Sequence, residues 1–336
     1  MQKNRPPAEW EPHRACWSAW PSHKEIWQEN LESAQLEFTQ LCKAIALSEK
    51  LEILIPFPEQ LMIAAHALRG LKVRFHAVPF GDIRLRDIVP IFTRNLETSQ
   101  LQTVRFGFNG WGGKYQPIHE DQVSKKVTDL MGVPFREFPW ILEGSAIEMD
   151  GRGTALTTRQ CLLNSNRNND RVPSENEVEE RLKEALNIEK VLWIEEGLLN
   201  DYADGHIDNL VRFVAPGHVV CLKTSGKSDP NEKVFKNIYE QLLNFTDVNG
   251  QKLKITQVNS PGNFENNEGH VVPASPLSFY ISNKIVIVPV FETEYDDLAV
   301  SQIAQCFPSR KTIGVKASSL LFGGGAFHSI TQQEPT

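Results

Sequence analysis

The sequence lacks long apolar runs and paired cysteines, and each absence excludes a class of protein. No segment reaches the roughly 18 to 20 apolar residues of a membrane span, and residues 1–7 lack the apolar core of a signal peptide. The five cysteines show neither CxxC nor Cys/His ligand spacing, which argues against a disulfide framework and against a zinc site. We therefore expect a cytoplasmic protein with reduced thiols and no membrane partner.

The sequence also lacks a long cluster of basic residues. The formal net charge is −7, and basic pairs such as Lys125-Lys126 and Arg310-Lys311 are too short to form a basic stripe. Nucleic acid is therefore an improbable partner. What the sequence does contain is the composition of a soluble globular protein, with 40% hydrophobic and 23% charged residues, in a chain of 336 residues that is long enough to bury a sizeable core.

Apolar patterns along the chain alternate between helical and strand periodicity. Helices are expected at residues 29–46, 58–69, 122–131, 173–186, 231–245 and 296–306, and strands at residues 51–56, 73–78, 103–108, 191–194, 211–214, 219–222, 254–258, 284–289 and 312–315. This alternation predicts an α/β protein. Several strand-and-helix units are similar, but no sharp sequence period accompanies them.

A run of three glycines, Gly323 to Gly325, precedes Ala326-Phe327-His328-Ser329 near the end of the chain. Such a run lets the backbone adopt conformations closed to other residues and pass close to a ligand. Two interpretations are open: a flexible tail, or a loop that holds Ser329 at a special position.

Four ionisable residues stand in unusual settings. Asp87 follows Arg84 and Arg86, which suggests either a salt-bridged loop carboxylate or a site residue. Glu143 lies among apolar residues, where a carboxylate either meets a cation or points to solvent. His206 and Asp208 are expected on one face of an extended segment, in a structural or a ligand-binding role.

Carboxylates that converge in a pocket repel one another, so their natural ligand is a delocalised cation such as a guanidinium, which pairs with carboxylates in a bidentate manner. A nucleophile on the glycine-rich loop would attack the guanidinium carbon. His206 would then protonate departing ammonia and later activate water.

At these residues the sequence resembles the agmatine deiminase family, also called the Porphyromonas-type peptidylarginine deiminase family. The resemblance runs through ordered motifs over essentially the whole chain: Pro7-Ala8-Glu9-Trp10-Glu11-Pro12-His13, Phe108-Asn109-Gly110-Trp111-Gly112-Gly113-Lys114, Leu142-Glu143-Gly144, Asp204-Gly205-His206-Ile207-Asp208-Asn209 and Ile330-Thr331-Gln332-Gln333. It implies a single catalytic domain over residues 1–336, folded as a five-bladed pseudosymmetric α/β propeller, the pentein fold. It also implies a homodimer.

The activity implied by the resemblance is hydrolysis of agmatine to N-carbamoylputrescine and ammonia through a covalent thiouronium intermediate, with no metal and no cofactor. Position by position, Asp87 and Asp208 resemble the carboxylates that grip the guanidinium, and Glu143 and His206 resemble the acid/base pair. The positions that resemble further substrate-binding residues are Arg84, Trp111 and Gly325. The nucleophile position falls on Ser329, where the family has cysteine.

The serine and its neighbours change the expected activity. A thiolate forms readily near neutral pH beside cationic groups and an alkoxide does not, so Ser329 predicts binding with very slow turnover or none. Arg84 stands where the family commonly has tryptophan, and a cation there would disfavour a dicationic amine such as agmatine. The alternatives are a non-catalytic guanidine-binding or scaffold protein, and a deiminase of arginine or peptidyl-arginine.

Overall fold

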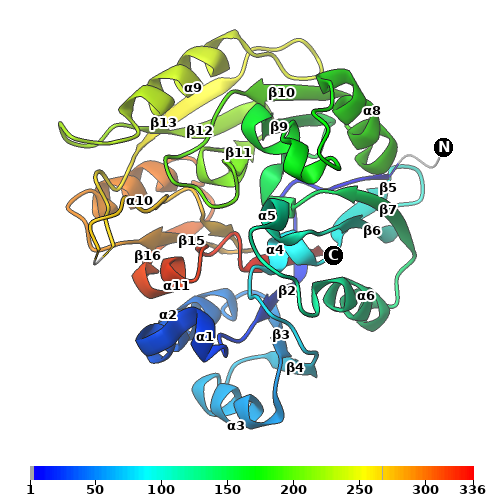
Figure 1. The fold of residues 1–336 in the computed structure, drawn as a ribbon, viewed down its shortest axis with the longest axis vertical. Coiled ribbons are helices and arrows are strands. Elements are labelled where there is room, and N and C mark those ends of the chain that lie inside the picture. Colours follow the sequence, from blue (N-terminus) through cyan, green and yellow to red (C-terminus); the bar gives the residue numbers. More distant parts are fainter. Residues whose placement is uncertain (1–3, 267) are drawn as a thin grey trace.

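The computed structural model describes residues 4–266 and 268–336, and within these ranges the strands form five sheets arranged around a common centre (Figure 1). Each sheet contains the same unit, in which two antiparallel strands are followed by a helix and a third strand parallel to the second. A helix is required because a parallel strand cannot be reached by a tight turn. The repeated unit explains why several strand-and-helix segments look alike in sequence.

Four of these units follow one another along the chain. Their strands are β5 (Ile91–Asn95), β6 (Leu101–Gly107), β7 (Phe135–Ile141), β8 (Glu148–Met149), β9 (Thr154–Thr158), β10 (Lys190–Ile194), β11 (Val211–Ala215), β12 (His218–Lys223), β13 (Lys254–Asn259), β14 (Tyr280–Ile281), β15 (Ile285–Val290) and β16 (Lys311–Lys316). The crossing helices are α6 (Glu120–Met131), α8 (Glu175–Leu186), α9 (Glu232–Asn244) and α10 (Asp296–Ala304), which lie at the periphery of the molecule (Figure 1).

The fifth unit joins the two ends of the chain. Strand β17 (Thr331–Pro335) pairs antiparallel with β2 (His13–Ala19), which runs parallel to β3 (Lys50–Ile55) after helix α2 (Leu31–Ile45). Strand β4 (Val73–Ala77), after helix α3 (Pro58–Ala67), extends this sheet, and β1 (Asn4–Arg5) extends the β5 sheet. The glycine-rich segment therefore leads into strand β17, which is paired with β2, and its interpretation as a flexible tail is wrong.

Helix α2 shows how the apolar pattern places a helix on its sheet. Phe38, Leu41 and Ile45 recur at the spacing of one helical face, and each is buried in the core shared with β2 and β3. Burial of such a side chain stabilises the fold by roughly 1.5 to 3 kcal/mol. No helix in residues 4–266 or 268–336 is long and apolar enough to cross a membrane.

Short helical turns lie between the longer elements, and Figure 1 places α4 and α5 near the centre of the molecule. They are α1 (Lys24–Trp27), η1 (Gln28–Asn30), α4 (Leu85–Ile88), α5 (Gly110–Gly113), η2 (Gly144–Ala146), α7 (Arg159–Leu162), η3 (Ser165–Arg167), η4 (Ile207–Asn209) and α11 (Ser318–Phe322). The expected extended conformation of residues 206–208 is wrong, because residues 207–209 form the 3-10 turn η4. The remaining expected helices and strands are present, with ends that differ by a few residues.

The closure between β17 and β2 generates a prediction. Trp17 Nε1 donates a 2.8 Å hydrogen bond to the buried Glu334 carboxylate, which joins the two strands. Replacing Trp17 with Phe removes the donor and leaves a buried carboxylate oxygen unpaired, which costs about 1 to 3 kcal/mol. Urea unfolding measures the loss. Trp140→Phe is the control, because the Trp140 indole nitrogen makes no hydrogen bond in the described structure. An equal loss of stability in both variants would contradict the stabilising role of the Trp17–Glu334 hydrogen bond.

Candidate active site

The turns between the sheets bring residues from distant parts of the sequence to the centre of the propeller. Asp87 lies in α4, Trp111 in α5, Asp208 in η4, and Glu143 and His206 immediately precede η2 and η4. Turn α4 contacts η2 and β17, and η2 contacts η4. The proposed catalytic and gripping residues, Asp87, Glu143, His206, Asp208 and Ser329, all have exposed fractions of 6% or less.

Asp87 is held by donors that carry no formal charge. Its Oδ2 accepts from Trp111 Nε1 at 2.9 Å, and its Oδ1 accepts from the Ser145 backbone N–H at 2.9 Å. His206 Nδ1 lies 3.9 Å from Oδ2. The interpretation of Asp87 as a carboxylate paired with its neighbouring arginines is wrong, because Arg84 binds Asp82 and Arg86 binds Glu9.

Trp111 occupies a strained turn that fixes its ring. Its φ is 54° and its ψ is 47°, a left-handed conformation that non-glycine residues rarely adopt. The Asn109 side chain stabilises the turn by accepting from the Gly112 N–H at 2.9 Å. The indole edge therefore faces Asp87, and its face stacks on the guanidinium of Arg84, whose Cζ lies 3.4 Å from the ring centroid.

Arg84 is anchored by Asp82, a residue that the sequence did not single out. Its Nε donates to Asp82 Oδ1 at 2.9 Å, and its Nη2 donates to Oδ2 at 2.8 Å. The other side of the guanidinium faces the glycine-rich loop. A Cβ on Gly324, which has a φ of +95°, would lie 2.9 Å from Arg84 Nη1, and a Cβ on Gly325 would lie 2.8 Å from that of Ser329. A side chain at either position would come too close to these neighbours, so both positions require glycine.

Glu143 meets a cation, as one of its two interpretations predicted, and the solvent-facing interpretation is wrong. Arg167 Nε donates to both carboxylate oxygens at 2.9 and 3.0 Å, and both residues are buried. Arg167 also donates to Asp204 and to the Ala203 carbonyl, so its planar group is fully engaged. Glu143 is fixed beside His206 by this pairing.

Asp208 is held by His328, the residue that precedes Ser329. His328 Nδ1 lies 2.7 Å from Asp208 Oδ2, and Nε2 lies 2.8 Å from Glu9 Oε1. Ionised carboxylates only accept hydrogen bonds, so both ring nitrogens must donate and His328 is an imidazolium. Sequence reasoning missed both His328 and Glu9, although Glu9 lies in a motif shared with the family and His328 lies beside the nucleophile position.

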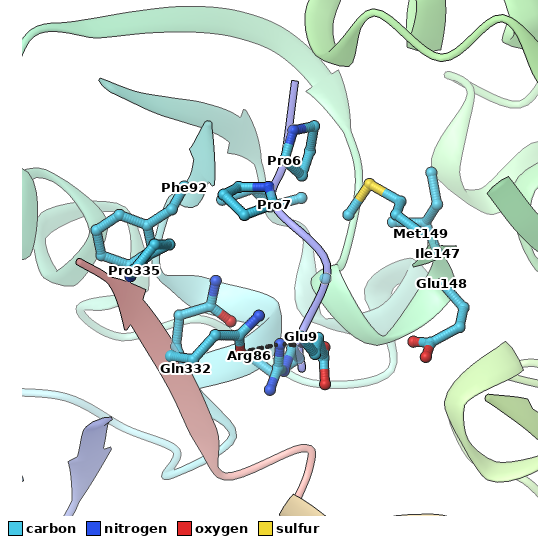
Figure 2. A pocket seen from close by; sticks show the side chains of 13 residues that line it. Pro6, Pro7, Glu9, Arg86, Phe92, Ile147, Glu148, Met149, Gln332 and Pro335 are labelled. Atoms are coloured by element: carbon cyan, nitrogen blue, oxygen red, sulfur yellow. Dashed lines mark hydrogen bonds and ion pairs between the residues drawn. The ribbon is translucent and has the colours of Figure 1, made fainter. Parts of the chain in front are cut away.

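A network of buried ion pairs surrounds His328. Glu9 binds Arg86 Nη1 at 2.9 Å, the contact drawn in Figure 2, and Arg212 Nη2 at 2.6 Å, while Arg212 Nε binds Glu148 at 2.8 Å. Burial acts to raise the pKa of Glu9, but Arg86, His328 and Arg212 together hold it well below its usual range. Burial likewise opposes ionisation of Asp208, and its hydrogen bond and charge interaction with His328 lower its pKa. Both carboxylates are therefore ionised.

The cavity beside Glu9 and Arg86 is too small for an organic ligand. Its volume is about 30 Å³, and its lining includes Pro6, Pro7 and Met149 (Figure 2). A water molecule needs roughly 10 to 15 Å³ of such space, so this cavity accommodates little more than water. A guanidinium compound must therefore reach the buried acids from another side.

Ser329 lies at the junction of these groups. Its carbonyl accepts from the Arg86 backbone N–H at 3.0 Å, and its hydroxyl makes no hydrogen bond with any residue that the structure describes. Two buried polar atoms of the site, Asp208 Oδ1 and His206 Nε2, lack a partner among the described residues. Buried polar atoms without partners are rare in proteins and need an explanation.

The arrangement offers two groups of metal-ligand types, Glu143 with Cys161 and His206, and Glu9 with Glu148 and His328. Arg167 already binds Glu143, and Arg86 and Arg212 bind Glu9. A metal ion at either place would have to displace a buried guanidinium from its carboxylate. The donor sets therefore fit ion pairs better than a cation site.

Comparisons with known proteins agree with this geometry. Residues 5–335 match the model of the Porphyromonas-type peptidyl-arginine deiminase family. An agmatine deiminase of Medicago truncatula is 34% identical, covering 98% of this chain and 96% of its own. A Mycoplasma capricolum protein provisionally named agmatine deiminase is 37% identical, covering 98% and 95%. The structure of the Enterococcus faecalis agmatine deiminase is 31% identical with a TM-score of 0.92, covering 99% and 96%. The expected pentein propeller is confirmed.

The pairing of Glu143 with Arg167 predicts a large loss of stability on substitution. Arg167→Gln leaves a fully buried carboxylate without its cation, which costs about 3 to 5 kcal/mol. Thermal and urea unfolding measure the difference. Arg171→Gln removes a pair with Glu177 at the surface and should change stability little. Similar losses in the two variants would show that Arg167 does not compensate Glu143.

The lowered pKa of Asp208 predicts how stability depends on pH. A carboxyl with a depressed folded-state pKa contributes stability that is present above its unfolded pKa, here close to the ordinary value of 3.8, and that is lost as the pH falls through the folded value. We expect the unfolding free energy of Asp208→Asn to fall less than that of the unmodified chain when the pH is lowered from 6 towards 2. Parallel pH profiles would contradict the ionised pairing with His328.

Proposed function

This chain belongs to the Porphyromonas-type peptidyl-arginine deiminase family, and we propose on that basis that its buried centre binds the guanidinium group of a small guanidine compound. The reaction for which the site is built is hydrolysis of a guanidinium C–N bond. Agmatine, converted to N-carbamoylputrescine and ammonia, is the first substrate to test, because the relatives are named for it.

One observation carries this proposal: Asp208 Oδ1 and His206 Nε2 are buried without partners beside a second carboxylate, Asp87, that forms no salt bridge with arginine or lysine in the described residues. A buried carboxylate oxygen without a donor, beside a carboxylate without an arginine or lysine partner, calls for N–H donors from a ligand. A guanidinium supplies planar N–H donors that match two carboxylates at once. Asp87 and Asp208 are accordingly proposed to hold the substrate head group.

The remaining residues take roles around that head group. The nucleophile at position 329 would form a bond to the guanidinium carbon, and the bond to one terminal nitrogen would break as His206 delivers a proton to departing ammonia. Water, deprotonated with the help of His206 and Glu143, would then displace the nucleophile and release the carbamoyl product. Trp111 and Gly325 would form the walls of the site.

Ser329 is the weak point of this mechanism. A thiol at position 329 would lie next to the His328 imidazolium, whose charge favours a thiolate. A serine hydroxyl does not ionise under the same influence, and a resonance-stabilised guanidinium is a poor electrophile. The binding groups are complete while the reactive atom is changed, so a guanidine-binding protein without turnover is the second candidate function.

Domain organisation, assembly and location follow from the sequence and its resemblance. We propose that residues 1–336 form one catalytic domain, that two copies form a homodimer, and that the protein works in the cytoplasm. The pairing of the last strand with the first long strand supports the single domain. The free cysteines support the reducing compartment.

Restoring the thiol tests the catalytic proposal. Ser329→Cys should raise the rate of ammonia release from a guanidine substrate by roughly 100-fold or more, equivalent to about 2.7 kcal/mol of activation free energy. Ammonia and the carbamoyl product are measured together, with agmatine, arginine and an arginine-ended peptide as substrates. Ser329→Ala is the matched control and should stay at the background rate.

A second variant separates chemistry from binding. Asp208→Asn in the Ser329→Cys background should remove the gained activity, because one carboxylate that grips the guanidinium loses its charge. Calorimetry on the unmodified chain should detect guanidine binding without turnover. Binding without any gain from the thiol would favour the non-catalytic guanidine-binding protein, and no binding at all would favour a scaffold.

A further inference from the structure

The wall of the proposed guanidinium site contains a guanidinium of its own, that of Arg84. This side chain is only 7% exposed, and its charged group lies between the face of Trp111 and the backbone of Gly324. The same indole donates a hydrogen bond to Asp87, whose carboxylate is proposed to bind the substrate guanidinium. A fixed positive charge therefore lies against the Trp111 ring, which borders the place where the substrate head group would bind.

Arg84 is held too firmly to move out of the way. Two of its nitrogens bind both oxygens of Asp82, and its stacking on Trp111 restrains the plane of the group. Burial acts to lower the pKa of Arg84, but Asp82 and Asp87 raise it above the ordinary value, so the group is always charged. It is a permanent part of the site wall.

One edge of this guanidinium remains free. Arg84 Nη1 makes no hydrogen bond with any residue in the described part of the chain, while Nε and Nη2 are both satisfied by Asp82. Nη1 is the nitrogen nearest to the Cβ position of Gly324. Gly324 and Gly325 also line a cavity of about 280 Å³, together with Tyr202 and Asp201, which leaves room for the tail of a small guanidine compound.

The cavity lining includes the carboxylate of Asp201, whereas Asp82 and Asp204 lie outside the lining and are already paired. Asp82 binds Arg84, and Asp204 binds Lys114 at 2.5 Å and Arg167 at 2.6 Å. Asp201 accepts from the backbone N–H groups of Ala203 and His206, and burial raises its pKa. A tail ammonium would thus meet the free donor of Arg84, and the Asp201 carboxylate in the cavity lining already accepts two backbone hydrogen bonds.

We propose that Arg84 selects the substrate tail, and that this site takes guanidine compounds whose tail ends in a carboxylate in preference to those whose tail ends in an ammonium. A tail carboxylate accepts from Nη1 and is attracted by the fixed charge, whereas an ammonium is repelled. This inference rests on the proposed function for the head group and narrows its substrate class to guanidino acids. Arg84 acts as a specificity residue and takes no part in the bond-breaking steps.

Calorimetry on the unmodified chain tests the proposal directly, because Ser329 leaves binding without turnover. The ligands share a guanidinium and a short alkyl chain and differ in the end of the tail, which is a carboxylate in γ-guanidinobutyrate, an uncharged methyl group in n-butylguanidine and an ammonium in agmatine. The expected order of affinity is acid, neutral compound, amine, with the acid at least about tenfold tighter than agmatine. High salt should leave most of this difference in place, because a buried charge such as that of Arg84 is screened much less than an exposed one.

Substitution of Arg84 assigns the preference to this residue. Arg84→Gln should weaken binding of the acid, leave the neutral compound within about twofold and strengthen agmatine, so that the acid loses its lead. Arg14→Gln is the matched control, because Arg14 is exposed on β2 and pairs with Glu334 away from the site. Thermal unfolding of each variant establishes that it is folded, and the order of affinity measured on the unmodified chain does not rely on any variant.

The outcomes separate the two levels of the proposal. If none of the three compounds binds, the head-group site itself is wrong and the tail preference falls with it. If agmatine binds as tightly as the acid or more tightly, the role of Arg84 is overturned while the head-group site stands. An acid preference that survives in Arg84→Gln would also overturn the assignment to this residue.

Discussion

The centre of this propeller depends on the pairing of His328 with two carboxylates. Asp208 comes from the third repeated unit, Glu9 from the first residues of the chain, and His328 from the last turn before the closing strand. The imidazolium holds all three segments together and compensates two negative charges where water is excluded. Removing one member of such a cluster leaves a buried charge without a partner. The closure of the fold and the electrostatics of the site therefore depend on the same residues.

The same pairing explains why the site is both rigid and incomplete. One oxygen of Asp208 is occupied by His328 and the other is left without a partner, so the carboxylate is oriented before any ligand arrives. Arg167 orients Glu143 in a comparable way. Fixing carboxylates in advance costs folding free energy but removes the cost of ordering them on binding. Such a site is suited to a planar cation of defined shape.

Arg84 and Ser329 alter this design in different ways. Ser329 changes the reactive atom and leaves the buried charges as they are, so recognition of the head group does not depend on it. Arg84 adds a charge at the boundary between the head-group site and the cavity for the tail, and Asp82, Trp111 and Gly324 together accommodate it. These three residues come from separate segments, so Arg84 is held in place from several sides of the site wall. This arrangement points to a changed ligand preference.

Local patterns and motifs determined much of this protein. Periodicity identified most helices and strands because their burial faces repeat every two or 3.6 residues, and the ordered motifs identified the family and predicted the residues of the site. They also showed that Glu143 needs a cation or solvent. Only the tertiary structure decided which partner these charges have: Glu143 with Arg167, and His328 between Asp208 and Glu9. Such pairs join residues that are up to 319 positions apart, and no local pattern encodes a contact that exists only once the five sheets close around their centre.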